Sequence, residues 1–159
     1  MLPTLSLDGT GGCVCYHVRR TARSVTRLYD AALQPAGIRS TQFAVLVAVA
    51  KNEPVNISRL ENLLGLDQTT LSRSLANLRA TGHLALAAGA DRRQRLARLT
   101  SKGRRTLGKA LPYWRRVQRD VVSRLDDPRW SAIVPGLRAV KRASGEVLRD
   151  RGLAGVGEG

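Results

Sequence analysis

Hydrophobic residues recur in steps of three and four along most of the chain, the spacing that lines one face of an α-helix. The first such stretch predicts a helix over about 13–33, with an apolar stripe made by Val18, Ala22, Val25, Tyr29 and Ala32. A second stretch predicts a helix that starts at Ser40 or Thr41, either of which can serve as its N-cap, and ends around 52–54. Pro35 and Gly37 lie between the two stretches, so a turn is expected there.

Two shorter helices are predicted next, over 57–64 and 68–80. Each follows a residue that suits an N-cap, Asn56 for the first and Asp67 for the second. Gly65 supplies a tight turn between them, and Gly82 ends the second. The apolar face of this second helix consists of Leu71, Leu75 and Leu78, so its polar side chains point elsewhere.

Beyond residue 82 the pattern changes. Residues 83–87 and 95–99 are predicted to be two short strands joined by a basic loop, which makes a hairpin. Thr100 suits the N-cap of a long helix to Leu125, with a kink at Pro112, because proline cannot donate a backbone hydrogen bond. A last helical region begins around 126–128 and is expected to break into two pieces at Pro135-Gly136.

The ends of the chain lack an apolar period. Residues 1–12 are predicted to be a flexible arm and residues 151–159 a flexible tail, because both are rich in glycine. The fold class predicted is mainly α, with one small hairpin.

Composition adds a strong charge to this picture. The 159 residues include 27 Lys and Arg against 12 Asp and Glu, a formal charge of +15 that attracts polyanions. The hydrophobic content of 43% is enough for the core of one domain. No apolar run reaches about 18 residues, the N-terminus does not resemble a signal peptide, and two cysteines cannot build a disulfide framework. We therefore expect a cytoplasmic nucleic-acid binder rather than a basic protein of a membrane surface.

The order helix, tight turn, helix, basic hairpin predicts a winged helix-turn-helix. In that fold the second helix enters the major groove, and the side chains of its first turns meet the base edges. The candidate DNA contacts on this helix are Gln68, Thr69, Thr70, Ser72 and Arg73, with Arg79 further along. Glutamine pairs with adenine, arginine with guanine, and a threonine methyl contacts thymine. The alternative is an ordinary solvated helix face.

The hairpin favours DNA over that alternative. Residues 91–105 include seven basic side chains against one acidic side chain. An arginine at a hairpin tip can enter a narrow minor groove, and the remaining cations can neutralise phosphates. The candidate contacts in the wing are Asp91, Arg92, Arg93 and Arg95.

These residues resemble the MarR family of bacterial transcription regulators. The segment 91–100 fits the family's D-x-R…L-T wing pattern, the following Ser101-Lys102-Gly103 fits its helix start, and 67–82 resembles its recognition helix. The resemblance covers nearly all of residues 13–150. We expect these residues to form one domain, with a winged helix over about 38–100. It implies a homodimer in which helices of about 13–34 and 101–150 pair. The two recognition helices would then enter successive major grooves of a pseudo-palindromic operator.

The resemblance also implies roles for particular residues. The wing aspartate and the arginine two positions later act together in the family, so Asp91 would orient Arg93 or Arg73; the alternative for Asp91 is a turn-forming role. Family members often bind small aromatic acids between the DNA-binding and dimer regions. The candidate residues for such an effector pocket are Tyr16, His17, Arg20, Phe43 and Trp114.

The C-terminal helices support a dimer independently of the resemblance. They carry more apolar surface than a small winged helix can cover: Trp114, Val117, Val121, Leu125, Trp130 and Ile133. An ordinary monomer core is the alternative, but a two-fold protein matches a palindromic operator.

Cys13 and Cys15 begin the first helix close to Arg19 and Arg20, and three interpretations remain open. A metal site would need more ligands than this segment offers, and no metal or cofactor is expected. A redox sensor is favoured by the basic surroundings, through a disulfide between subunits or a sulfenic acid. Simple packing at the dimer interface is the third interpretation.

The patterns and the family resemblance together predict the function. The sequence lacks a nucleophile elbow, a Walker loop, an H-E-x-x-H pair and a paired-carboxylate motif, so we expect no enzyme. The prediction is a sequence-specific regulator of transcription, a homodimeric repressor released by a small molecule or an oxidant. The alternative is a nucleoid-type protein that binds DNA without sequence preference.

Overall fold

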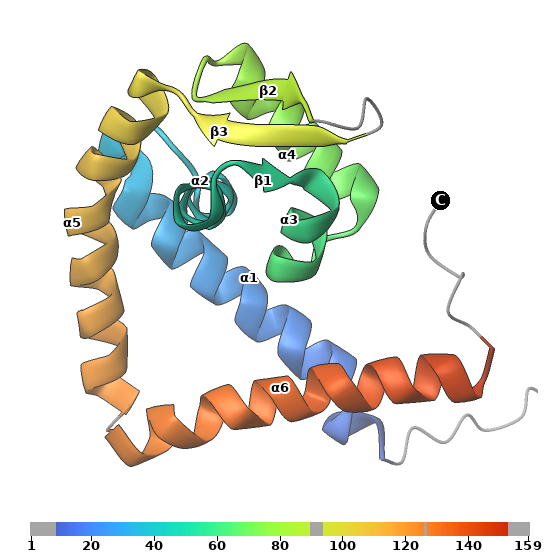
Figure 1. Ribbon diagram of the computed structural model, residues 1–159. Helices are drawn as coiled ribbons and strands as arrows, with labels where there is room; N and C mark the ends of the chain where they lie inside the picture. Colours follow the sequence, from blue (N-terminus) through green and yellow to red (C-terminus); the bar gives the residue numbers. More distant parts are fainter. Residues whose placement is uncertain (1–8, 90–93, 126, 153–159) are drawn as a thin grey trace, which may run out of the picture.

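A computed structural model describes residues 9–89, 94–125 and 127–152 of the chain (Figure 1). Helices dominate, and the only sheet in this described part is small. The elements in chain order are η1 (Thr10–Gly12), α1 (Val14–Leu33), η2 (Gln34–Ala36), α2 (Ser40–Asn52), β1 (Val55–Asn56), α3 (Ile57–Leu64), α4 (Gln68–Ala80), β2 (Leu84–Ala88), β3 (Arg95–Leu99), α5 (Ser101–Leu125) and α6 (Asp127–Asp150).

The sheet carries the predicted hairpin and one strand that the sequence did not reveal. β2 and β3 pair antiparallel from Leu84–Leu99 to Ala88–Arg95, which confirms the hairpin, although its first strand begins at Leu84 rather than His83. β1 adds to the other edge of β3, giving the order β1-β3-β2. β1 is only two residues long, too short to show an alternating pattern.

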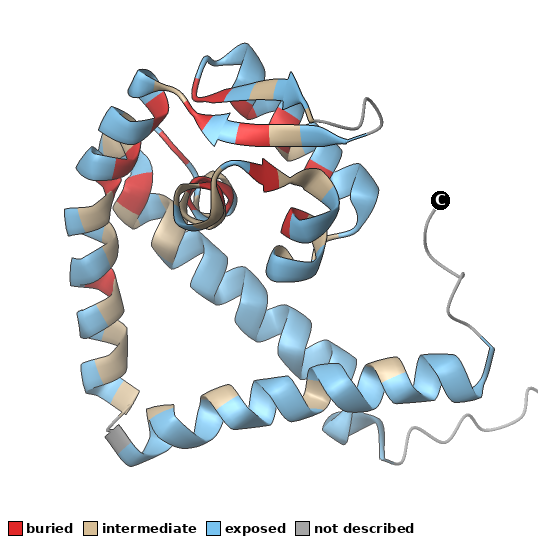
Figure 2. Cartoon of the chain, in the orientation of Figure 1, coloured by how far each residue is buried: buried red, intermediate tan, exposed pale blue. Residues whose placement is uncertain are grey.

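A single apolar core holds α2, α3, α4 and the sheet together. Figure 2 shows that the buried residues gather in this upper part of the molecule. α2 lies at its centre, and the fully buried side chains come from several elements: Leu33, Val45, Leu46, Val49, Val55, Leu60, Leu71 and Leu78. Each buried leucine stabilises the fold by roughly 1.5–3 kcal/mol relative to an exposed one.

Local capping explains why the short helices begin and end where they do. The Asn56 side chain accepts from Ser58 N–H at 3.0 Å, and the Asp67 side chain accepts from Thr70 N–H at 2.7 Å. Thr100 Oγ1 accepts from Gly103 N–H at 3.0 Å at the start of α5. Gly65 has φ +62°, the left-handed conformation that ends α3. The predicted boundaries of α3 and α4 are confirmed.

The start of α2 differs from the expectation that Ser40 or Thr41 would cap it. Ser40 is the first helical residue, and Arg39 occupies the N-cap. Asp30 of α1 accepts from Ser40 N–H at 2.7 Å and from Ser40 Oγ at 2.6 Å. These bonds lower the pKa of Asp30 below its ordinary value. The carboxylate of Asp30, from another helix, thus accepts the hydrogen bond that an N-cap side chain would accept. The sequence around residue 40 could not reveal this contact.

The prolines inside α5 and α6, Pro112 and Pro135, do not end these helices. α5 runs through Pro112 to Leu125. α6 runs through Pro135 to Asp150, so the expected break at Pro135-Gly136 is wrong. Pro135 has no N–H to donate to the carbonyl of Ser131, but both residues are exposed, so water can take the place of the missing N–H.

α1, α5 and α6 extend away from the core as a largely exposed frame (Figures 1 and 2). Apolar side chains on α1 and α6 are open to solvent in the single chain, including Val18, Val25, Ile133, Leu137 and Val147. Two residues predicted to add to a dimer surface are instead covered by the chain itself: Val117 is buried, and Trp114 packs on the core. Within the described residues, no helix has the length and apolar content needed to cross a membrane.

Candidate nucleic-acid interface

The outer face of α4 presents most of the predicted DNA contacts. Leu71, Leu75 and Leu78 anchor the helix in the core, at helical spacing. Thr69 and Arg73 are four residues apart on the opposite, exposed side, with Ala76 and Ala80 next along that side. Small alanine side chains leave room for a close approach to a groove. Sequence reasoning missed these two alanines, although their position opposite the leucines could have identified them.

Thr70 is partly committed to the cap of its own helix. Its backbone N–H and its hydroxyl both donate to the Asp67 carboxylate, each at 2.7 Å. The same bonds lower the pKa of Asp67. The hydroxyl of Thr70 can therefore accept a hydrogen bond from a base but has no proton left to donate.

Two hydrogen bonds from other helices fix the position of α4. Gln42 of α2 donates to Asn77 Oδ1 at 2.8 Å. Lys102 of α5 donates to the carbonyl of Thr81, just past the end of α4, at 2.8 Å. These supports come from segments far apart in sequence, so sequence reasoning did not find them.

The wing lies beside α4. Arg95 and Arg98 are exposed on β3. Ser72 and Arg79 of α4 share a hollow of about 300 Å³ with Arg95, on an apolar floor that includes Leu75 and Leu86. The structure therefore brings together three of the predicted contacts from two elements. Three others, Asp91, Arg92 and Arg93, lie outside the described residues.

Most of the positive charge lies away from this face. α1, α5 and α6 together contain 17 Lys and Arg against five Asp and Glu, a net +12 of the total +15. Within the described residues the only ion pair joins Arg104 to Glu53. The net charge of the whole chain therefore does not show how much positive charge lies on α4 and the wing.

The five candidate effector residues fall into two groups. Tyr16, His17 and Arg20 lie together on the exposed first turns of α1, where Arg20 donates to the Tyr16 hydroxyl at 3.3 Å. Phe43 and Trp114 stack at a ring distance of 5.8 Å between α2 and α5. In the single chain these two groups do not share a pocket.

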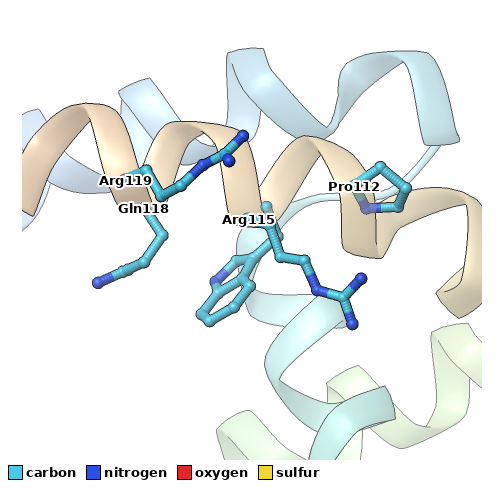
Figure 3. A pocket seen from close by; sticks show the side chains of 5 residues that line it. Pro112, Arg115, Gln118 and Arg119 are labelled. Carbon is cyan, nitrogen blue, oxygen red and sulfur yellow. The ribbon is translucent and has the colours of Figure 1, made fainter.

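A hollow of about 470 Å³ opens beside α5, and Trp114 is the only predicted effector residue that lines it. Figure 3 shows Pro112, Arg115, Gln118 and Arg119 around it. Tyr29 of α1 donates to Gln118 Oε1 at 2.6 Å, and burial raises the pKa of Tyr29. The hollow thus combines an indole, two guanidinium groups and an oriented amide.

Cys13 and Cys15 are free thiols at the start of α1, and both are exposed. Cys13 occupies the N-cap, and Cys15 is the second residue of the helix. His17 Nε2 lies 2.8 Å from the carbonyl of Gly11. Within the described residues, His, Cys, Asp and Glu side chains form no group of three that could hold a metal ion.

A helix-turn-helix with an exposed polar face, followed by a cationic hairpin, defines the chain as a winged helix-turn-helix protein. The MarR family model matches residues 36–94. The structure of the M. tuberculosis transcriptional regulator MosR in complex with DNA is 38% identical to this chain, with a TM-score of 0.75, and covers 83% of this chain and 98% of its own. The chain belongs to the MarR family.

The chain is also similar to two further regulators. The HTH-type transcriptional regulator TtmR of Methylorubrum extorquens is 32% identical over 103 residues, which is 63% of this chain. That segment is 53% of TtmR, so the chain spans about half the length of this relative. The regulator PcaV from Streptomyces coelicolor, in complex with its natural ligand, shares the fold at 22% identity and a TM-score of 0.76, covering 90% of this chain and 99% of its own.

Proposed function

We propose that this chain is a sequence-specific repressor of transcription that binds a pseudo-palindromic DNA operator as a homodimer. The observation that carries the proposal is the outer face of α4, with Thr69 and Arg73 exposed opposite the leucine anchors and Arg95 of the wing beside it. A helix with this face fits the major groove while the wing reaches the adjacent minor groove. The DNA complex of MosR, at 38% identity, supports the same mode of binding.

The homodimer rests on apolar surface that the single chain leaves open. Val14, Val18, Val25 and Leu28 are exposed on α1, and Leu137, Val147 and Leu148 on α6. Apolar side chains left open along two helices are typical of an interaction site. A two-fold partner would cover it and place two copies of α4 on one side of the DNA duplex.

A comparison of the operator with random DNA tests this function. Genome-wide mapping of bound DNA supplies the operator, and affinity is then measured for it and for a scrambled duplex at one fixed salt concentration. A specific regulator binds its operator about 10³-fold or more tightly than random DNA. A ratio near one would favour the nucleoid-type alternative.

The release signal is a small aromatic acid that binds in the hollow beside α5. Trp114 can stack on an aromatic ring, and Arg115 and Arg119 can pair with a carboxylate. PcaV, which shares the fold, is known in complex with its natural ligand. A panel of aromatic acids should release DNA from the parent but not from Arg119→Gln, and Lys109→Gln, which removes an exposed cation from the same helix, serves as the control.

An oxidant is a second release signal, because Cys13 and Cys15 are open to solvent. Peroxide can join one thiol to a thiol of the second subunit, taking two hydrogens and leaving as two waters. The new disulfide would change the spacing of the recognition helices. Peroxide should weaken DNA binding and produce a cross-linked dimer on non-reducing gels, and Cys13→Ser or Cys15→Ser should abolish the response. If peroxide does not affect the wild-type protein, the two cysteines are packing residues and not a redox sensor.

A further inference from the structure

Glu53 joins three elements of the winged helix through one carboxylate. The residue follows α2 and precedes β1. Its Oε2 accepts from the backbone N–H of Leu99, the last residue of β3, at 2.8 Å. Its Oε1 lies 2.6 Å from the guanidinium of Arg104, in the first turn of α5. The Glu53 side chain is only 16% exposed, whereas that of Arg104 is 59% exposed.

The sheet register explains why a side chain is needed at this point. Val55 pairs with Ala97 and Asn56 with Leu96, so the same register places Glu53 opposite Leu99. The N–H of Thr100 donates to His83 on the β2 side, and alternation therefore turns the N–H of Leu99 toward the β1 side. β1 does not extend that far. The Glu53 carboxylate supplies the acceptor that a longer strand would have supplied, and so satisfies an N–H on a buried residue.

We propose that Glu53 is a positioning residue that fixes the angle between the wing and α5, and thereby sets how deeply the wing engages DNA. The proposal rests on the DNA-binding function proposed above. β3 carries the exposed Arg95 and Arg98 and leads into α5 through Thr100. One carboxylate holds both the last residue of the strand and the first turn of the helix, so it restricts rotation at the joint between them.

The same contact connects the wing with the hollow beside α5. Arg104 lies in the first turn of the helix that also carries Arg115 and Arg119. The helix that lines this hollow is therefore also the helix that Glu53 ties to the last residue of β3.

Two substitutions that change the net charge in opposite directions distinguish a positioning role from a general effect of charge on DNA binding. Glu53→Gln keeps an acceptor for Leu99 but loses the ion pair, and it makes the protein more positive. Arg104→Gln loses the same ion pair and makes the protein less positive. Arg105→Gln is the matched control, because it removes the neighbouring exposed cation, which forms no ion pair within the described residues.

The experiment measures affinity for operator duplexes with A·T-rich and with G·C-rich flanks at one salt concentration, together with the thermal unfolding midpoint of each variant. A wing in a narrow minor groove should make the parent favour A·T flanks. Glu53→Gln and Arg104→Gln should both reduce this preference, by about 2- to 30-fold, and the double variant should lose no more than either single variant. Arg105→Gln should weaken both duplexes equally.

Several results would overturn the positioning role. One is a parent that binds its operator but ignores the flanks. Another is a pair of single variants that keep the flank preference of Arg105→Gln, and a third is a shift of opposite sign for Glu53→Gln and Arg104→Gln. An equal loss on both duplexes that follows the unfolding midpoint would likewise make the contact merely structural. A parent that does not distinguish the operator from random DNA would instead contradict the proposed function itself.

Discussion

Arg73 is the side chain on α4 best placed to read a base. It lies on the exposed side, one helical turn beyond Thr69 and opposite the leucine anchors. The guanidinium offers two parallel donors that match the acceptor pair on the major-groove edge of guanine. Thr70, in contrast, already donates its hydroxyl hydrogen bond to Asp67. We therefore expect base discrimination to depend more on Arg73 than on Thr70.

Replacing Arg73 by alanine should cost roughly 1–3 kcal/mol of binding free energy on the operator and relax the preference at one base pair. Lys109→Ala is the control, since it removes an exposed cation of α5. Affinities for the operator and for its single-base variants provide the measurement. Equal weakening of Arg73→Ala on every sequence would reduce Arg73 to a phosphate contact.

The recognition helix, the wing and α5 meet at a junction built around His83. This histidine is buried, and its Nδ1 lies 2.8 Å from the Thr81 hydroxyl. Burial lowers the pKa of His83 below its ordinary value, and the positive charge of Lys102 lowers it further. The unfolded chain therefore takes up a proton at a higher pH than the folded chain does.

This difference predicts how stability depends on pH. Above about pH 6.5, the ordinary value for histidine, His83 is neutral in both states and the fold keeps its full stability. As pH falls below that value, the unfolded state binds the proton first, so stability declines, by at most about 1.4 kcal/mol per pH unit. Denaturant unfolding between pH 5 and 8 should show this slope in the parent and in His17→Gln, but not in His83→Gln. A slope unchanged in His83→Gln would assign it to other groups.

Elements were predictable from sequence wherever their signals are local. α3 and α4 begin at Asn56 and Asp67, whose side chains bond within their own first turn, and both boundaries are confirmed. The first residue of α2, in contrast, donates to Asp30, ten residues upstream in another helix. The two-residue strand β1 forms only because β3 lies beside it. The continuity of α6 through Pro135 depends on its exposure to water, which a proline in the sequence does not reveal.

In the candidate site, too, the features with a local sequence signal were predictable and those that depend on long-range packing were not. Helical spacing alone placed Thr69 and Arg73 on the outer side of α4. The supports of that helix, Gln42 and Lys102, and the Glu53 contact depend on long-range packing and could not be read from the sequence. The effector residues were chosen by type, and only Trp114 lines the hollow beside α5.

At the scale of the whole molecule, the charge distribution predicts opposite effects of salt on two equilibria. A dimer formed by α1, α5 and α6 would bring together two sets of net +12. Salt screens this repulsion, so dimerisation should strengthen between about 50 and 500 mM salt. DNA binding should weaken over the same range, because salt opposes the release of counterions from phosphates. Sedimentation without DNA and binding titrations with DNA measure the two trends, and dimerisation that weakens with salt would contradict this interpretation.

The spacing of two half-sites on DNA is the most direct test of a dimeric repressor. Hydroxyl-radical footprinting on the mapped operator should show two protected half-sites whose centres lie about 10 base pairs apart, or a multiple of that distance. Inserting about 5 base pairs between them turns one half-site to the far side of the duplex, so affinity should fall sharply, by an order of magnitude or more. A single protected half-site bound by a monomer, or an affinity indifferent to the insertion, would contradict the account.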